Sequence, residues 1–308
     1  MAYLGEICAL LTALCWTGSS MSFAVASRAA GSLASNQFRL LIALPVLLAL
    51  GWAATGQLWP VHLPQDRLGL LVLSGLSGLV LGDFGFFHAL ATIGPRHSSV
   101  LMASWPLFAI LIALCMGESF APGMALGAGL LIAGVLLVLL RSHEGAAWNP
   151  GLTRRQLVTG VLGALCGALG QAGGVVLARV AMAVGPDLPE GVVPLQATVV
   201  RMVTALVGLM LVSCWMPSPL AFVAVCRNRG ALWAALVGAA FGPVAGVWLS
   251  MVATRYAANV GVAAALMATT PIFMMPVSAV VYGARIGRAG VAGTVLAVAG
   301  AIVLLLTR

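Results

Sequence analysis

Long apolar runs, separated by short gaps that hold most of the charges, make up nearly all of this chain. The runs predict helices over residues 4–27, 35–55, 68–92, 97–116, 123–141, 155–182, 194–215, 230–254, 259–282 and 288–306. A helix that crosses a hydrocarbon core of roughly 30 Å needs about 20 residues, which is close to the length of each run. Transmembrane β-barrels alternate apolar and polar residues, and these runs do not. The sequence therefore predicts an all-α membrane protein with about ten transmembrane helices.

The charges are too few and too scattered for a soluble domain or a nucleic-acid surface. Asp, Glu, Lys and Arg together make up 7% of the residues, against about a quarter in an ordinary soluble domain. The net charge is +8, and every Lys or Arg residue is an arginine. These arginines occur singly or in pairs between apolar runs and not along one exposed face. We interpret them as anchors to loops or lipid headgroups, including Arg39 and Arg201 near the starts of two predicted helices. The six cysteines show no metal-ligand spacing, so we expect no metal and no cofactor.

The chain divides into two related halves. Residues 1–141 form the first and residues 155–308 the second, with a polar linker at 142–154 between them. The segment 102–108 is repeated at 267–273 with four identities in seven positions, and Arg39 of the first half recurs as Arg201. Because each half has an odd number of predicted spans, the second must enter the membrane from the opposite side. The sequence therefore predicts two inverted five-helix repeats, an architecture typical of secondary transporters that expose a midplane site alternately to each side.

Asp83 is the most informative polar residue inside a predicted span. An ionisable side chain at the bilayer centre costs roughly 2.5–3.5 kcal/mol on insertion scales, so such residues usually face the interior of the bundle. We interpret Asp83 as a candidate for substrate contact or proton coupling, with a purely structural hydrogen bond as the alternative. His88 lies about 140° further round the same helix, so we expect a structural role for it.

Two prolines occupy matching places in the halves. Pro106 and Pro271 each lack an amide donor and would free the carbonyls of Met102 and Met267 four residues earlier. Unpaired carbonyls persist within a membrane only beside protein or a water-filled cavity. The prolines therefore predict helices that bend at a central cavity, with a purely mechanical kink as the alternative. The same cavity offers places for Trp16, Trp105, Gln171 and Trp248.

A family resemblance follows from a set of short motifs. The motifs are Gly82-Asp83, His88-Ala89-Leu90, Gly94, Pro106, Gly117-Glu118 and Gly134, echoed by Leu249-Ser250, Ala268-Thr269-Thr270-Pro271, Gly283 and Gly300. This pattern resembles the EamA-type transporters of the drug/metabolite transporter superfamily. The resemblance implies ten helices, export of amino acids or related metabolites from a bacterial inner membrane, and a cavity lined by Trp16, Asp83, Trp105, Gln171, Trp248, Thr269 and Thr270. One departure is that Ala284 stands where the first half has Glu118.

The leading hypothesis is therefore a transporter, not an enzyme, with a small-molecule substrate, the lipid bilayer as surroundings, protons as a candidate coupling ion and no nucleic-acid partner. A multidrug or organic-cation exporter is the alternative, because one acid among aromatic side chains suits a cation. An intramembrane serine protease is a remote alternative, because Gly75-Leu-Ser77-Gly78 matches the short G-x-S-G element of such enzymes. The serine would need a histidine base from another helix, and no other predicted helix supplies one. The sequence leaves open the substrate, the direction of transport, the energy coupling, the oligomeric state and the orientation. On the last point the arginine count favours external termini and the resemblance favours cytoplasmic ones.

Overall fold

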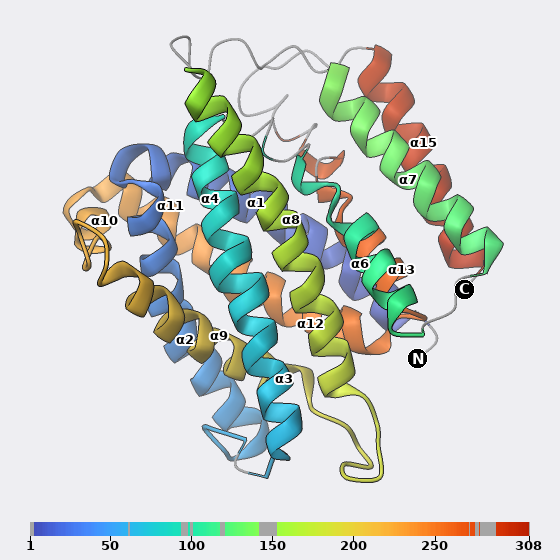
Figure 1. Ribbon diagram of the computed structural model, residues 1–308, viewed down its shortest axis with the longest axis horizontal. Coiled ribbons are helices and arrows are strands. Elements are labelled where there is room, and N and C mark those ends of the chain that lie inside the picture. Colours follow the sequence, from blue (N-terminus) through green and yellow to red (C-terminus); the bar gives the residue numbers. More distant parts are fainter. Residues whose placement is uncertain are drawn as a thin grey trace.

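The computed structural model describes residues 3–60, 62–93, 98, 101–117, 121–141, 153–270, 272–274, 277 and 288–307, and it is a bundle of helices (Figure 1). The first half contributes α1 (Leu4–Ala30), α2 (Ser32–Thr55), α3 (Gln65–Gly75), η1 (Leu76–Gly82), α4 (Asp83–Thr92), α6 (Trp105–Cys115) and α7 (Pro122–Arg141). The second half contributes α8 (Arg154–Met182), α9 (Pro194–Ser213), α10 (Val223–Arg227), α11 (Arg229–Ala239), η3 (Ala240–Gly246), α12 (Val247–Tyr256), α13 (Val260–Met267) and α15 (Arg288–Leu306). The expected all-helical architecture is confirmed for the described residues.

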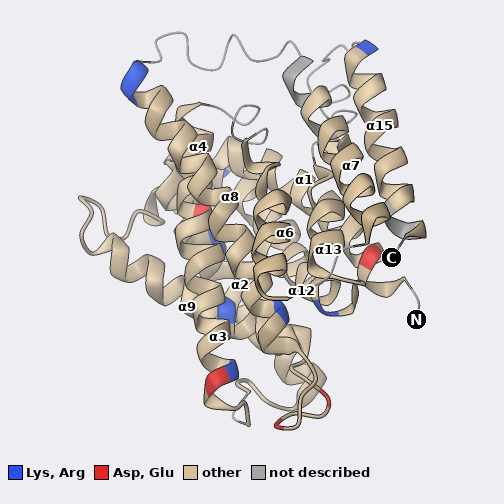
Figure 2. Cartoon of the chain, turned by 45° about the vertical axis from the view of Figure 1, so that its right-hand side comes forward, with Lys and Arg blue, Asp and Glu red and all other residues tan. Residues whose placement is uncertain are grey.

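Six stretches of the described chain are long and apolar enough to cross a membrane. Their mean hydropathy lies between 1.4 and 1.9, and they are Leu4–Ala30, Ser32–Thr55, Gln65–Thr92, Arg154–Met182, Pro194–Ser213 and Arg229–Tyr256. Shorter apolar helices lie at Trp105–Cys115, Pro122–Gly134 and Arg288–Val303. Figure 2 shows how sparse the charged residues are over the whole molecule. A chain with this surface is an integral membrane protein.

The helices of the two halves interleave. α1 packs against α11, η3, α12 and α13 of the second half, and α8 packs against α3, η1, α4 and α6 of the first half. α2 and α9 also pack against each other. Each half therefore inserts its first helix into the other half, and the contacts of the two first helices correspond.

Two segments of π-helix occupy matching places in the halves. η1 and η3 each span seven residues and begin at residues 76 and 240, which are 164 positions apart. Each segment joins two α-helices of one membrane-spanning stretch, η1 between α3 and α4 and η3 between α11 and α12. π-Helical turns are rare and concentrate at functional sites, because their wider turn displaces the side chains that follow. Both segments contribute residues to the cavity described below.

The helix expected over 97–116 is interrupted, and the correction has a clear cause. Ala103 and Ser104 form a turn, and α6 begins at Trp105. Pro106 is thus the second residue of a helix, where its missing amide costs no hydrogen bond. In the second half α13 ends at Met267, and Ala268 and Thr269 form the matching turn. The predicted interruption of this helix is confirmed, but it lies before Trp105, so Pro106 stands in the first turn of α6 and does not interrupt that helix.

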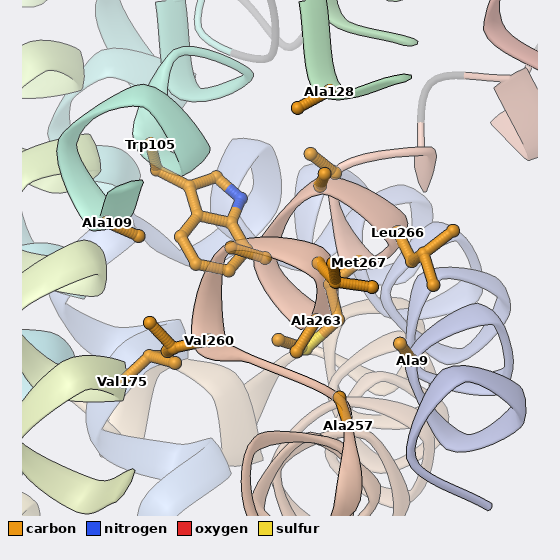
Figure 3. Packing of buried hydrophobic residues seen from close by; sticks show 14 of the residues in the cluster. Ala9, Trp105, Ala109, Ala128, Val175, Ala257, Val260, Ala263, Leu266 and Met267 are labelled. Carbon is orange, nitrogen blue, oxygen red and sulfur yellow. The ribbon is translucent and has the colours of Figure 1, made fainter. Parts of the chain in front are cut away.

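The largest cluster of buried apolar residues surrounds α6 and α13. Every residue of α13 is buried, as expected for a helix enclosed on all sides. In Figure 3 the Trp105 ring lies beside the helix that carries Ala263, Leu266 and Met267, with Ala9 and Val175 on neighbouring helices. Small side chains dominate these contacts, which lets the helix backbones approach closely. The core thereby fixes the positions of the two interrupted helices.

α7 and α15 form a pair at one side of the bundle (Figure 1). Gly134 of α7 faces the α15 backbone so closely that an added Cβ atom would lie 2.4 Å from the amide nitrogen of Ala297. Gly300 of α15 faces α7 in the same way, with a Cβ position 2.3 Å from the amide nitrogen of Leu131. These repeat-matched glycines are therefore contact points and not flexible joints.

We predict that Gly134→Ala destabilises the protein by about 1–3 kcal/mol, the usual cost of overfilling a packed interface. Gly129→Ala on the same helix is the matched control, because no atom lies within 4 Å of its Cβ position. Thermal unfolding in detergent measures both variants. Equal unfolding temperatures for the two variants would contradict the proposed contact.

Arg67, at the start of α3, ties the loop between α8 and α9 to the first half. Its Nε and Nη2 atoms donate to the two carboxylate oxygens of Asp187 at 2.9 and 2.8 Å. Its Nη1 atom donates to the carbonyls of Ala181, at 3.0 Å, and Ala183. Arg255 similarly donates to the carbonyls of Glu190 and Val192. For Arg67 and Arg255 the interpretation as loop anchors is confirmed.

Asp187 gives this anchor a pH dependence. Hydrogen bonding from Arg67 holds the pKa of Asp187 below its ordinary value, so the pair stabilises the folded state fully above the ordinary aspartate pKa of about 3.9. That contribution is lost as the pH falls through the lower pKa of the folded state. We predict that Asp187→Asn lowers the unfolding temperature slightly at pH ~7 and that its difference from the wild type shrinks as the pH falls below about 3.9. Asp66→Asn, at an exposed acid beside Arg67, is the control, and a pH-independent difference for Asp187→Asn would refute the assignment.

Candidate functional site

A cavity of about 130 Å³ lies between the two halves. Most of its wall is apolar or aromatic, and its ionisable lining residues are two arginines and one aspartate. The lining residues are Trp16, Ser19, Ser20, Phe23, Arg39, Leu79, Asp83, Phe86, Phe87, Leu90, Met102, Ala103, Trp105, Gln171, Arg201, Gly242, Val247, Ser250, Met267, Ala268 and Thr270. Both π-segments and both interrupted helices reach it. The cavity is therefore built from the elements that differ most from regular helix.

Asp83 and Arg39 form an ion pair on the cavity wall. The Arg39 Nη2 atom donates to a carboxylate oxygen of Asp83, and the two side chains are 8% and 15% exposed. The Nε atom of Arg39 donates to the Asn36 side chain at 2.7 Å. The guanidinium carbon lies 5.0 Å from the ring centre of Phe87 and 6.0 Å from that of Phe23, within the range of cation–π contact. The interpretation of Arg39 as a headgroup or loop anchor is wrong, because its charge is used inside the bundle.

Arg201 is the second buried cation of the cavity. The residue is 1% exposed, its Nη1 atom lies 2.8 Å from the Met251 sulfur, and its Nε atom is buried without a hydrogen-bond partner. Among the residues that the structure describes, no acid forms an ion pair with it. The anchor interpretation is therefore wrong for Arg201 as well. Both arginines lie seven positions after the first residue of their helices, which carries them two turns into the bundle.

Seven of the residues singled out from the sequence line the cavity: Trp16, Asp83, Met102, Trp105, Gln171, Met267 and Thr270. They come from α1, α4, the two interrupted helices and α8. The structure thus brings together residues that lie far apart in the sequence. Their contact with a substrate stays a prediction.

Four other candidates lie away from the cavity, and Pro271 is outside the described residues. His88 lines a separate hollow with Ser32 and Asn36, as its angular distance from Asp83 predicts. Pro106 is buried at the start of α6, and Trp248 packs against the apolar cluster between α2 and α9. The Thr269 hydroxyl donates to the Leu266 carbonyl at 2.7 Å, so it caps the end of α13.

The expected free carbonyl at Met267 is satisfied within the chain. The Thr270 hydroxyl donates to it at 3.1 Å, and the Thr270 carbonyl in turn accepts from the Thr17 hydroxyl at 3.1 Å. Threonines placed directly after the interrupted helix thus repair the break that the sequence suggested. The hypothesis that the Met267 carbonyl is free for a substrate is therefore wrong.

Sequence reasoning missed several cavity residues, above all the two arginines and the phenylalanines Phe23 and Phe86. The repetition of an arginine at the same depth in both halves was the available signal. The phenylalanines carry no such signal, because an apolar side chain suits lipid, core and cavity equally. Ser77, the serine of the protease-like motif, donates its hydroxyl to the Gly170 carbonyl at 3.0 Å and thereby joins η1 to α8.

Comparison with known proteins adds the family. The model of the EamA-like transporter family matches the chain twice, over residues 3–140 and 158–306. A crystal structure of another protein superposes with a TM-score of 0.75 at 20% sequence identity, covering 100% of this chain and 98% of that one, which shows a shared fold alone. A search of curated proteins found no match. Because the family model covers most of both halves, the chain belongs to the EamA-like transporter family.

Proposed function

We propose that this membrane transporter moves a small metabolite, an amino acid or a related compound, outward across a bacterial inner membrane by alternating access. The observation that carries the proposal is the cavity lined by residues of both halves, whose first helices each pack into the other half. Inverted repeats support such a cycle because rocking one half against the other exchanges the side to which a central site opens.

The elements around the cavity suit this motion. η1 and η3 cross the wall at matching places, and their irregular hydrogen bonding makes them the natural points of bending. α1 and α8, each inserted into the opposite half, would shift with their partners. The cavity would then open on one side as the contacts on the other side close.

The lining favours a metabolite over an organic cation. A buried organic cation is bound more favourably where a free acidic group stands beside the aromatic rings. Asp83 is the acid of this cavity, and Arg39 already occupies it. The aromatic surfaces of Trp16, Phe86 and Trp105 remain available to the apolar part of a metabolite.

We predict that the purified protein in liposomes exchanges labelled amino acids for unlabelled ones in counterflow, and that Ala268→Phe lowers the exchange at least about tenfold. Ala268 is 5% exposed and lines the cavity, so a phenyl ring there fills the substrate space. Ala133→Phe, on the exposed face of α7, is the matched control. Counterflow of none of the amino acids, or full activity in Ala268→Phe, would contradict the proposal.

Proton coupling through Asp83 is the second part of the proposal. A proton on Asp83 releases Arg39, and the return of the pair releases the proton. The double variant Arg39→Gln and Asp83→Asn removes both charges together and avoids an isolated buried charge. We predict that this variant retains counterflow but no longer accumulates substrate under a pH gradient. Accumulation equal to that of the wild type would eliminate Asp83 as the coupling group.

A further inference from the structure

The two halves differ at one place in the cavity wall. Asp83 is the first residue after η1, and Val247 is the first residue after η3. Both line the cavity. The first half therefore supplies a carboxylate where the second half supplies an apolar side chain.

The arginines that belong to these positions occupy equivalent places in the two halves. Arg39 lies over the ring of Phe87, four residues after Asp83, and Arg201 contacts the sulfur of Met251, four residues after Val247. α2 packs against α4 as α9 packs against α12. Arg201 thus occupies the place of Arg39 in its own half but lacks the carboxylate that Arg39 binds.

Arg201 has no ion-pair partner of its own among the described residues, because Asp83, the acid that acts on both arginines, is bound by Arg39. A buried guanidinium in this position is energetically unfavourable, and it keeps its charge at neutral pH. The ion pair of Arg39 and Asp83 is neutral as a unit, so the ionisable residues of the lining that the structure describes sum to one positive charge. A ligand with a single negative charge balances it. The cavity is therefore suited to an anion.

The surroundings of Arg201 suit a carboxylate in particular. A Cβ atom on Gly78 would lie 3.0 Å from the Nη2 atom of Arg201, so the guanidinium packs directly against this glycine. The planar guanidinium pairs with both oxygens of a carboxylate at once. Leu79, Val247 and Trp16 offer apolar surface to the rest of the molecule.

We propose that Arg201 binds the carboxylate of the transported molecule, so that the substrates are small carboxylates with an apolar body. This inference rests on the proposed transport function and names its substrate class. The ligand carboxylate takes the place that Asp83 holds in the first half.

The test uses three probes of one shape and different charge: phenylpropanoate, phenylpropanamide and phenylpropylammonium. Binding to the purified full chain is followed by tryptophan emission, because Trp16 and Trp105 line the cavity. We expect the wild type to bind the anion at least about tenfold more tightly than the amide and the cation. Arg201→Gln should remove this preference and leave the binding of the amide unchanged.

A second pair of variants tests the same site while keeping Arg201. Val247→Asp supplies the missing carboxylate within the chain, so it should weaken phenylpropanoate binding at least about tenfold. Val247→Asn has nearly the same shape without the charge and should retain anion binding. Arg229→Gln, at an exposed arginine, is the control for a general loss of positive charge.

Three results would overturn the inference: unchanged anion affinity in Val247→Asp, equal losses for all three probes in Arg201→Gln, or a wild type that prefers the cation. If Arg201→Gln does not fold, the Val247 variants decide. Counterflow separates this inference from the proposed function. Selective anion binding without exchange of any substrate supports the site and refutes transport, whereas exchange of the cation alone supports transport and refutes the site.

Discussion

A guanidinium carried into a helical membrane bundle needs a counter-charge or several acceptors, and the centre of this protein is arranged around two such groups. Arg39 meets the need through Asp83, Asn36 and two aromatic rings. Arg201 meets it only in part, through the Met251 sulfur. Because water is excluded from the surrounding hydrocarbon, the deficit can be met only inside the cavity. The surroundings of Arg39 and Arg201 depend on the helix packing, on the placement of the π-segments and on the polarity of the cavity wall.

Much of the fold follows from the sequence because hydrocarbon leaves few choices. An apolar run of sufficient length must be helical there, and α1, α2, α8, α9 and α15 end within a few residues of their predicted bounds. η1 could not be predicted, because it has the same apolar composition as the helices around it, whereas η3 contains Pro243, a residue that disrupts a regular α-helix. The start of α6 was missed for a different reason: a proline is compatible both with a kink and with the first turn of a helix, and only packing selects between them.

The site was predicted less completely than the fold, since a side chain's depth depends on where its helix begins. Arg39 and Arg201 were interpreted as anchors because they lie near the starts of their helices and recur in both halves, whereas both stand seven positions into their helices and line the cavity. His88 was assigned correctly away from Asp83, because angle around a helix is fixed by spacing alone. Thr270 shows the opposite case: a hydroxyl that closes a break by local hydrogen bonding looks identical, in the sequence, to one that is free for a ligand.

The two repeats give the protein two halves of similar architecture, and different residues at matching places make the cavity wall asymmetric. At Gly246, the last residue of η3, an added Cβ would lie 2.8 Å from the Trp16 ring. At the matching Gly82 it would lie 3.2 Å from the Gln171 backbone nitrogen. The two π-segments therefore face an indole on α1 and an amide-bearing residue on α8. The second half also has Val247 where the first half has Asp83. One part of the wall is therefore rich in aromatic surface, and the other part holds the positive charge of Arg201. In the proposed cycle a substrate with a charged end and an apolar body would hold one orientation while the halves rock around it. Strict symmetry between the repeats would remove this preferred orientation of the substrate. In the proposed cycle, the positions where the halves differ therefore determine specificity, and the positions where they agree allow the rocking motion.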